Sequence, residues 1–210
     1  LFPCERSELE NKKYSCGARK EEELSAKKKI KTKTMSLLNI KIGDKAPEIF
    51  NAVVEIPKDS QNKYEVDKKT GMISLDRVLY SPIHYPADYG FIPETKAEDG
   101  DQADVLVLGS DPLFPGCVVR VRPIGMLNMI DAGEQDNKIL GVQADNPRFD
   151  SIKDISDIEK FHTHHLKEIA HFFQTYKELQ GKIAVISGWE NAEAAKKEIE
   201  KARKMYKDEK

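Results

Sequence analysis

The sequence contains no long hydrophobic run and few cysteines. No stretch of about 18 or more apolar residues, the length that a membrane-spanning helix needs, occurs among its 210 residues. Its three cysteines, Cys4, Cys16 and Cys117, include no Cys-x-x-Cys pair, so neither a disulfide framework nor a zinc site is predicted. We therefore expect a cytoplasmic protein in a reducing setting, without a membrane partner.

The motifs of several large enzyme classes are also missing. The sequence has no Gly-x-Gly-x-x-Gly, no Walker-type phosphate loop, no His-Glu-x-x-His and no Gly-x-Ser-x-Gly. These absences exclude the common signatures of dinucleotide binding, nucleotide hydrolysis, zinc proteolysis and serine hydrolysis. A calcium loop that starts at Asp99 fails as well, because Asp104 falls where glycine is required.

The net charge is small, −2, but it is unevenly distributed. Residues 1–34 hold ten Lys or Arg and six Glu, which leaves 24 basic and 30 acidic side chains in residues 35–210. This acidic body argues against nucleic acid as a partner, because phosphate backbones bind basic surfaces. Residues 1–34 show no apolar periodicity and are predicted to be a disordered extension, with an organellar transit peptide as the alternative. Residues 35–210 are predicted to form a single catalytic domain.

Short β-rich segments fill the middle of the chain, and helical periodicity follows them. The predicted strands are 51–57, 63–67, 72–80, 104–108, 117–127 and 138–144. After about residue 155 the apolar spacing changes to three and four, which predicts helices over 166–179 and 191–206, the second capped by Asn191. The pattern indicates a mainly β protein with helices (α+β), built as a barrel or sandwich.

Two acidic segments adjoin apolar strands. In "EDGDQADVLVL" the acidic residues are Glu98, Asp99, Asp101 and Asp104, and in "DAGEQDNK" they are Asp131, Glu134 and Asp136. Glu55 and Glu65 add carboxylates on predicted strands. Such close carboxylates repel each other unless cations lie between them, and Asp-rich, His-poor clusters suit Mg²⁺ or Mn²⁺. The alternative interpretation is a pair of solvated acidic turns.

Basic residues accompany these acids. Lys63 shares a strand face with Glu65, and Arg77 falls among apolar residues by strict alternation, where it needs an anionic partner. Lys138 and Lys177 end two further segments. Metal ions together with Lys and Arg are typical of sites for phosphorylated substrates.

In this order, the segments resemble the family I soluble inorganic pyrophosphatases of bacterial and plant type, over residues 37–205. The matching pieces are "VVEIP", "KYEVDKKTG", "DR", "YPADYGFIP", "DGDQADVLV", "PGCVVRVRPIG", "DAGEQDNK", "HFFQTYKEL" and "GWENAEAAK". Gln102 and Ala103 depart from the family pattern at positions that are not ligands. The resemblance implies a small closed OB-like β-barrel flanked by two C-terminal helices, which hydrolyses inorganic diphosphate to two orthophosphates.

The resemblance also implies a role for each site residue. Mg²⁺, for which Mn²⁺ can substitute, would be held by Asp99, Asp104 and Asp136, with Asp131, Glu55 and Glu65 serving further ions. Asp101 would accept a proton from the attacking water. The phosphate oxygens would be bound by Lys63, Arg77, Tyr89, Lys138, Tyr176 and Lys177, and Tyr85 would line the site.

Two other function classes stay open at this point. A metal-dependent phosphoesterase or nuclease would use the same acidic cluster, and an OB-like barrel could be an oligonucleotide-binding module. The binding module predicts a basic, aromatic face, which the acidic body does not favour. The family further implies a homohexamer, and the helix around residues 162–173 is predicted to be a contact because it has surplus aromatic surface.

Overall fold

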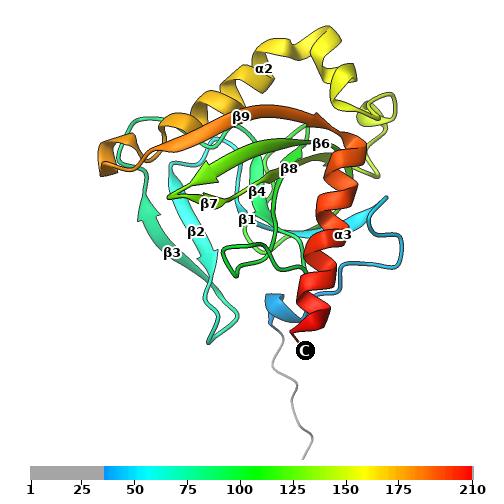
Figure 1. Cartoon of the computed structure of the whole chain (residues 1–210), viewed down its shortest axis with the longest axis horizontal. Coiled ribbons are helices and arrows are strands. Elements are labelled where there is room, and N and C mark those ends of the chain that lie inside the picture. Colours follow the sequence, from blue (N-terminus) through cyan, green and yellow to red (C-terminus); the bar gives the residue numbers. More distant parts are fainter. Residues whose placement is uncertain (1–35, 210) are drawn as a thin grey trace, which may run out of the picture. The chain divides into compact units, whose positions relative to one another are not determined.

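The computed structural model describes residues 36–209, apart from the side chains of residues 161 and 162, and this part of the chain is mostly β-sheet (Figure 1). The strands are β1 (Phe50–Ile56), β2 (Asn62–Val66), β3 (Ile73–Val78), β4 (Asp88–Phe91), β5 (Asp104–Leu108), β6 (Val118–Asp131), β7 (Glu134–Gln135), β8 (Lys138–Gln143) and β9 (Ala184–Asn191). The helices are α2 (Ile155–Thr175) and α3 (Ala192–Asp208), with 3₁₀ turns at Leu37–Asn39, Pro147–Phe149 and Glu178–Gln180. The predicted extension, residues 1–34, lies outside the described residues.

Strands β1, β4, β5, β8 and β6 form a closed ring. Each strand pairs with the next in this order, and β1 also pairs with β6, so the ring has no free edge between them. All these pairings are antiparallel except that of β5 with β8, which is parallel. The ring confirms the prediction of a small closed β-structure, and closure removes the sheet edges that invite aggregation.

Strands β2 and β3 form a separate two-stranded sheet beside the ring (Figure 1). The turn between them contains Gly71 at φ 68°, a left-handed conformation that glycine adopts readily. The register is irregular: Lys63 lies opposite Arg77, but Tyr64 lies opposite Leu75, so Asp76 is an extra residue. The prediction that Arg77 follows strict alternation was therefore wrong, because this bulge resets the alternation.

Helix α2 packs against one side of the ring and of β9 (Figure 1). Asp154 and Asp157 form a capping box at its start. The helix begins at Ile155, before the predicted start at residue 166. It ends at Thr175, earlier than the predicted end at residue 179. Phe172 and Phe173 are buried in the core, so these two rings do not supply the surplus aromatic surface that was expected around residues 162–173.

Helix α3 covers a second side of the ring. Its cap is Asn191, whose side chain accepts a hydrogen bond from the backbone N–H of Ala194 at 3.0 Å, as predicted. Ala195, Ile199 and Ala202 recur at helical spacing and are buried against the ring. The two predicted C-terminal helices are thus confirmed, each closing its own part of the core.

Three strands were missed by the periodicity argument. Strand β9, between the two helices, pairs with the second half of β6, from Gly125 to Asp131, and β7 is only two residues long. Strand β4 contains Gly90, where a Cβ atom would lie 1.9 Å from the carbonyl oxygen of Val53 in β1. Glycine is required there for the two backbones to pair. Helices in the described range fall short of the length and apolar character that a membrane crossing requires.

Candidate active site

One polar cavity of about 270 Å³ collects most of the predicted site residues. Twelve of them line it, namely Glu55, Lys63, Glu65, Tyr89, Asp99, Asp101, Asp104, Asp131, Asp136, Lys138, Tyr176 and Lys177. Arg77 and Tyr85 are not in the lining, but Arg77 lies opposite Lys63 on the hairpin and Tyr85 packs on Tyr89. Tyr64, Val66, Lys68, Phe91 and Gln102 also line the cavity and were not predicted as site residues.

The parallel pairing of β5 with β8 explains how the two acidic segments meet. Parallel strands begin at the same edge of a sheet, and the first residues of these strands, Asp104 and Lys138, are direct neighbours. The Lys138 ammonium group contacts the carboxylates of both Asp104 and Asp136. Burial disfavours the charged form of Lys138, but the two carboxylates outweigh it and raise its pKa above the ordinary value.

Strand β6 and the end of α2 add a second, partly buried pair. Lys177, just after the helix, contacts the Oδ2 atom of Asp131 at the end of β6. The Oδ1 atom of Asp131 is buried and has no hydrogen-bond partner among the described residues. A buried carboxylate oxygen normally has a partner, so this atom is a candidate ligand for a bound cation.

Aromatic rings form the apolar side of the cavity. Tyr85 is buried and packs on Tyr89, with ring centroids 5.5 Å apart, and on Phe172 at 4.7 Å. Tyr85 therefore supports Tyr89 from behind. Burial raises the pKa of Tyr89 and Tyr176 above the ordinary value, so both phenols stay protonated and can donate hydrogen bonds.

The β2–β3 hairpin supplies the opposite side of the cavity. Lys63 contacts Glu65, and its ammonium lies 3.2 Å from the Oδ2 atom of Asp76. Arg77 reaches the same Asp76 oxygen at 2.5 Å. The anionic partner that the sequence required for Arg77 is therefore its own neighbour, which also holds Lys63 beside it.

Glu55 on β1 joins the ring to the hairpin. Its Oε1 atom accepts a hydrogen bond from the backbone N–H of Val66 at 2.8 Å. Burial raises the pKa of Glu55 to about 7, against the effect of this hydrogen bond. Glu55 can thus be neutral near physiological pH unless a cation binds next to it.

The loop that carries Asp99 and Asp101 forms the mouth of the cavity. The backbone N–H of Asp101 donates to the Oδ1 atom of Asp99 at 2.9 Å. Lys68, from the turn of the hairpin, contacts the Asp101 carboxylate. Sequence reasoning missed Lys68, because no local pattern distinguishes it from the other lysines of that turn.

Comparisons with known proteins agree with this geometry. The family model for inorganic pyrophosphatase matches residues 52–207. An inorganic pyrophosphatase of Geobacillus stearothermophilus is 52% identical over 163 residues, which is 78% of this chain and 97% of the relative. This chain belongs to the inorganic pyrophosphatase family. Soluble inorganic pyrophosphatase 3 of Arabidopsis thaliana is 46% identical over 168 residues, 80% of this chain and 76% of the relative.

A solved structure supports the same assignment. The crystal structure of inorganic pyrophosphatase from Thermus thermophilus superposes with a TM-score of 0.79 at 46% identity, and covers 82% of this chain and 99% of that chain. The predicted fold and the predicted hydrolysis of diphosphate are therefore confirmed for this pyrophosphatase. The alternative of a general metal-dependent phosphoesterase or nuclease is not favoured.

The pyrophosphatase family is metal-dependent, and the donors in the cavity suit a hard cation. The acidic lining offers carboxylate oxygens without Cys or His, the preference of Mg²⁺ and similar ions. In residues 36–209, no three Asp, Glu, His or Cys side chains converge closely enough to hold an ion as they stand. Lysine ammonium groups instead lie against these carboxylates. Among the described residues, the site thus fits a cation in donor type and in the unpartnered Oδ1 atom of Asp131.

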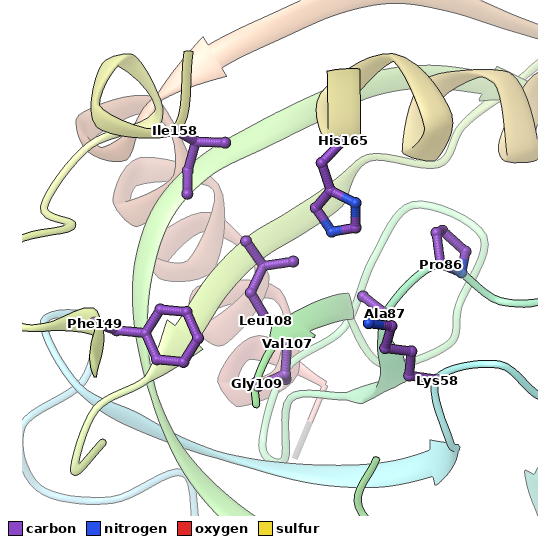
Figure 2. A pocket seen from close by; sticks show the side chains of 9 residues that line it. All are labelled: Lys58, Pro86, Ala87, Val107, Leu108, Gly109, Phe149, Ile158 and His165. Atoms are coloured by element: carbon purple, nitrogen blue, oxygen red, sulfur yellow. The ribbon is translucent and has the colours of Figure 1, made fainter. Parts of the chain in front are cut away.

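A second cavity of the pyrophosphatase lies beneath α2 and has a different character. It measures about 190 Å³ and contains none of the predicted site residues (Figure 2). Its lining is mostly apolar, with Leu108, Phe149 and Ile158 among its residues, and only Lys58 and His165 are basic. An apolar lining of this kind does not suit a small, highly charged anion.

Proposed function

We propose that the polar cavity binds diphosphate with several Mg²⁺ ions, for which Mn²⁺ can substitute. Asp99, Asp104 and Asp136 hold the activating ions, and Asp131, Glu55 and Glu65 serve further ions. Phosphate oxygens are bound by Lys63, Arg77, Tyr89, Lys138, Tyr176 and Lys177, while Tyr85 supports Tyr89. One observation carries this proposal: two carboxylates from different acidic segments share the buried ammonium group of Lys138.

The reaction in this proposal needs no nucleophilic side chain. Bound Mg²⁺ would lower the pKa of a water molecule and neutralise charge on the phosphate oxygens. Asp101 accepts the proton of the water that attacks one phosphorus atom. As the bridging P–O bond breaks, Lys and Arg side chains stabilise the charge on the leaving phosphate. The products are two orthophosphates.

Lys138 contributes differently from the exposed cations. Its Nζ atom lies 5.9 Å from the ring centre of Tyr89 and 5.8 Å from that of Phe173. The aromatic surroundings exclude water, which strengthens the attraction between the ammonium group and an anionic oxygen. We expect Lys138 to be the fixed charge against which a phosphate group is aligned.

The test compares three substrates under one set of conditions. The full chain is assayed with diphosphate, p-nitrophenyl phosphate and single-stranded DNA, each with Mg²⁺, with Mn²⁺ and with EDTA. We expect rapid release of phosphate from diphosphate with either metal and none with EDTA. Faster hydrolysis of p-nitrophenyl phosphate or DNA, or full activity in EDTA, would contradict the proposed site.

We further propose that the enzyme is a homo-oligomer, specifically a hexamer as the resemblance implies. Support comes from apolar side chains left exposed near the start of β9: Leu179 is 66% exposed, Ile183 79% and Val185 54%. Ile130 lies opposite Val185 on β6 and extends this surface. Sedimentation at micromolar concentration should give one species about six times the 23.8 kDa chain mass. A monomer alone would contradict this proposal.

Residues 35–210 are proposed to be the complete catalytic domain, in the cytoplasm. Every residue assigned to the site lies in this range, and the cysteines show no pairing pattern. Deletion of residues 1–34 should leave kcat and the melting temperature nearly unchanged. A large loss of either would show that the segment contributes to the domain or to its assembly.

A further inference from the structure

Lys68 lies where it can act on the reaction, although no motif points to it. It is in the turn of the β2–β3 hairpin and lines the polar cavity. Its ammonium group contacts the Oδ1 atom of Asp101, which is 33 residues away in the sequence. The hydrogen bond to Asp101 raises the pKa of Lys68, so the amine is charged in this contact.

The backbone that carries Lys68 is held firmly. The Oδ1 atom of Asp67 accepts hydrogen bonds from the backbone N–H and the hydroxyl of Thr70, both at 2.7 Å. The backbone N–H of Gly71 donates to the carbonyl of Asp67 at 2.7 Å. A Cβ atom on Gly71 would lie 2.1 Å from the hydroxyl of Ser36, so the turn also packs tightly against the segment beneath it.

The backbone that carries Asp101 is equally constrained. The N–H of Ala97 donates to the carbonyl of Asp101 at 2.7 Å. The buried hydroxyl of Thr95 accepts from the N–H of Ala103 at 3.0 Å and donates to the carbonyl of Ile92 at 2.5 Å. The turn that carries Lys68 and the loop that carries Asp101 are therefore both held by backbone hydrogen bonds. The contact between the two side chains then sets the orientation of the Asp101 carboxylate.

The other lysines of the cavity are engaged elsewhere. Lys63 contacts Glu65 and Asp76, Lys138 contacts Asp104 and Asp136, and Lys177 contacts Asp131. Within the described range, the cation that contacts Asp101 is Lys68. Loss of its charge would therefore leave the Asp101 carboxylate without a contacting cation among residues 36–209.

We propose that Lys68 is a positioning residue of the pyrophosphatase: it holds the Asp101 carboxylate in the orientation needed to accept a proton from the attacking water. The inference rests on the role proposed for Asp101. Lys68 acts through Asp101 and does not bind the diphosphate. Misplacement of a reacting group by about 1 Å can lower a rate by two orders of magnitude, so a side chain of this kind matters even though the ion pair itself is exposed.

The experiment measures kcat, KM for diphosphate and Mg²⁺ affinity for the full chain and its variants. Lys68→Gln should lower kcat about tenfold, part of the roughly 10²–10⁴ that a general base contributes, and leave KM nearly unchanged. Lys68→Arg should restore most of kcat, because the guanidinium group can hold the same carboxylate. Lys69→Gln is the matched control, since it removes the same charge from the same turn and should behave as the native chain.

Two further measurements separate positioning from other effects. In the Asp101→Asn background, Lys68→Gln should have almost no additional effect on kcat, because coupled residues are not additive. Mg²⁺ affinity of Lys68→Gln, measured by calorimetry without substrate, should be equal to or slightly tighter than native, since a positive charge near the site is removed. A merely structural defect of the turn would weaken Mg²⁺ binding and lower the melting temperature.

Other results would contradict the role of Lys68, the role of Asp101, or both. A rise in KM with unchanged kcat, or an undiminished effect in the Asp101→Asn background, would show that Lys68 binds the substrate directly and would refute the inference. If Lys68→Gln and Lys69→Gln have the same kcat while the native chain hydrolyses diphosphate, the inference fails and the proposed function stands. If Asp101→Asn keeps the native rate, both the proposed role of Asp101 and the inference fail.

Discussion

The two sides of the polar cavity use the same chemistry in different surroundings. On the ring, Lys138 is 2% exposed between Asp104 and Asp136, which are 23% and 16% exposed. At the mouth, Lys68 is 72% exposed and Asp101 59%. Both sides consist of lysine–carboxylate contacts, yet only the ring side is removed from water.

The difference in exposure determines how much each ion pair contributes to the stability of the fold. Removal of one partner from a buried ion pair leaves an uncompensated charge, which is strongly unfavourable, whereas an exposed pair contributes only about 0–1 kcal/mol. The ring side therefore contributes buried charges to the stability of the fold, whereas the exposed ion pair at the mouth contributes little to it. The difference predicts that substitutions on the two sides will have distinct effects on stability.

The largest effect should come from Lys138→Met. The variant leaves Asp104 and Asp136 facing each other without the shared cation, so we expect the free energy of unfolding to fall by about 3–5 kcal/mol and activity to be lost. Urea denaturation monitored by circular dichroism measures the change. Lys68→Met is the matched substitution on the exposed side and should alter stability by less than about 1 kcal/mol. An equal loss of unfolding free energy in the two variants would contradict the distinction between the buried and the exposed ion pair.

Asp104→Asn and Asp136→Asn should each cut turnover by orders of magnitude. The amide keeps the shape of the carboxylate but is a weaker ligand for a hard cation. The Mg²⁺ concentration needed for half-maximal activity should rise, and excess metal should partly restore the rate. Near-native rate and metal affinity in either variant would remove these residues from the metal site.

Asp101→Asn should lower the maximal rate more than it changes the Mg²⁺ requirement. The proposed proton acceptor is lost while the ligands remain, so the maximal rate should fall by about 10²–10⁴ even at saturating Mg²⁺. The metal requirement should shift less than in the Asp104 variant. The measurement is rate against Mg²⁺ concentration for the two Asn variants. Full rescue of Asp101→Asn by metal would reverse the assigned roles.

The Glu55 side chain should give a smaller, pH-dependent effect on stability. Its pKa in the folded protein is about 7, above the ordinary value of 4.5, so the protonated form stabilises the fold. This contribution is complete below pH 4.5 and is lost as the pH rises through 7. In EDTA, Glu55→Gln should match the native free energy of unfolding near pH 4 and exceed it at pH 8 by on the order of 1–3 kcal/mol. The exposed Glu134→Gln is the control; a pH-independent difference for Glu55→Gln would contradict the shift.

The smallest effect is expected for Glu65→Gln. Glu65 is 52% exposed and contacts Lys63, so loss of its charge should change the free energy of unfolding by less than about 1 kcal/mol. Any effect on activity should appear as a higher Mg²⁺ requirement. A destabilisation as large as that of Lys138→Met would show that exposure does not govern these pairs.

The sequence allowed prediction of the elements that have a strong local pattern. The apolar run at 104–108 became β5 with the same bounds, and Asn191 caps α3 as predicted. Strand β9 was missed because it is only partly buried and lies between two helices, so its residues show no regular alternation. Local periodicity reports burial on one face, and it is weak wherever a strand is partly exposed.

The site was predictable for its motif residues and unpredictable where contacts are non-local. Asp104 and Asp136 are marked by dense acidic segments, and their cavity positions agree with the resemblance. Arg77 was misplaced because the bulge at Asp76 depends on pairing with β2, which one strand's sequence does not encode. Lys68 owes its place to a turn and a loop that meet only in the folded chain.

The pairing of β1 with both β4 and β6 has a consequence for how the enzyme regains activity after denaturation. The β2–β3 hairpin joins neighbours in the sequence, whereas closure of the ring joins strands far apart in it. Distant pairings form slowly because the intervening chain must first be ordered. We expect secondary structure to recover early after dilution from urea and diphosphate hydrolysis to appear only with the slowest phase. Activity that returned with the first circular dichroism signal would show that the cavity assembles before the ring is closed.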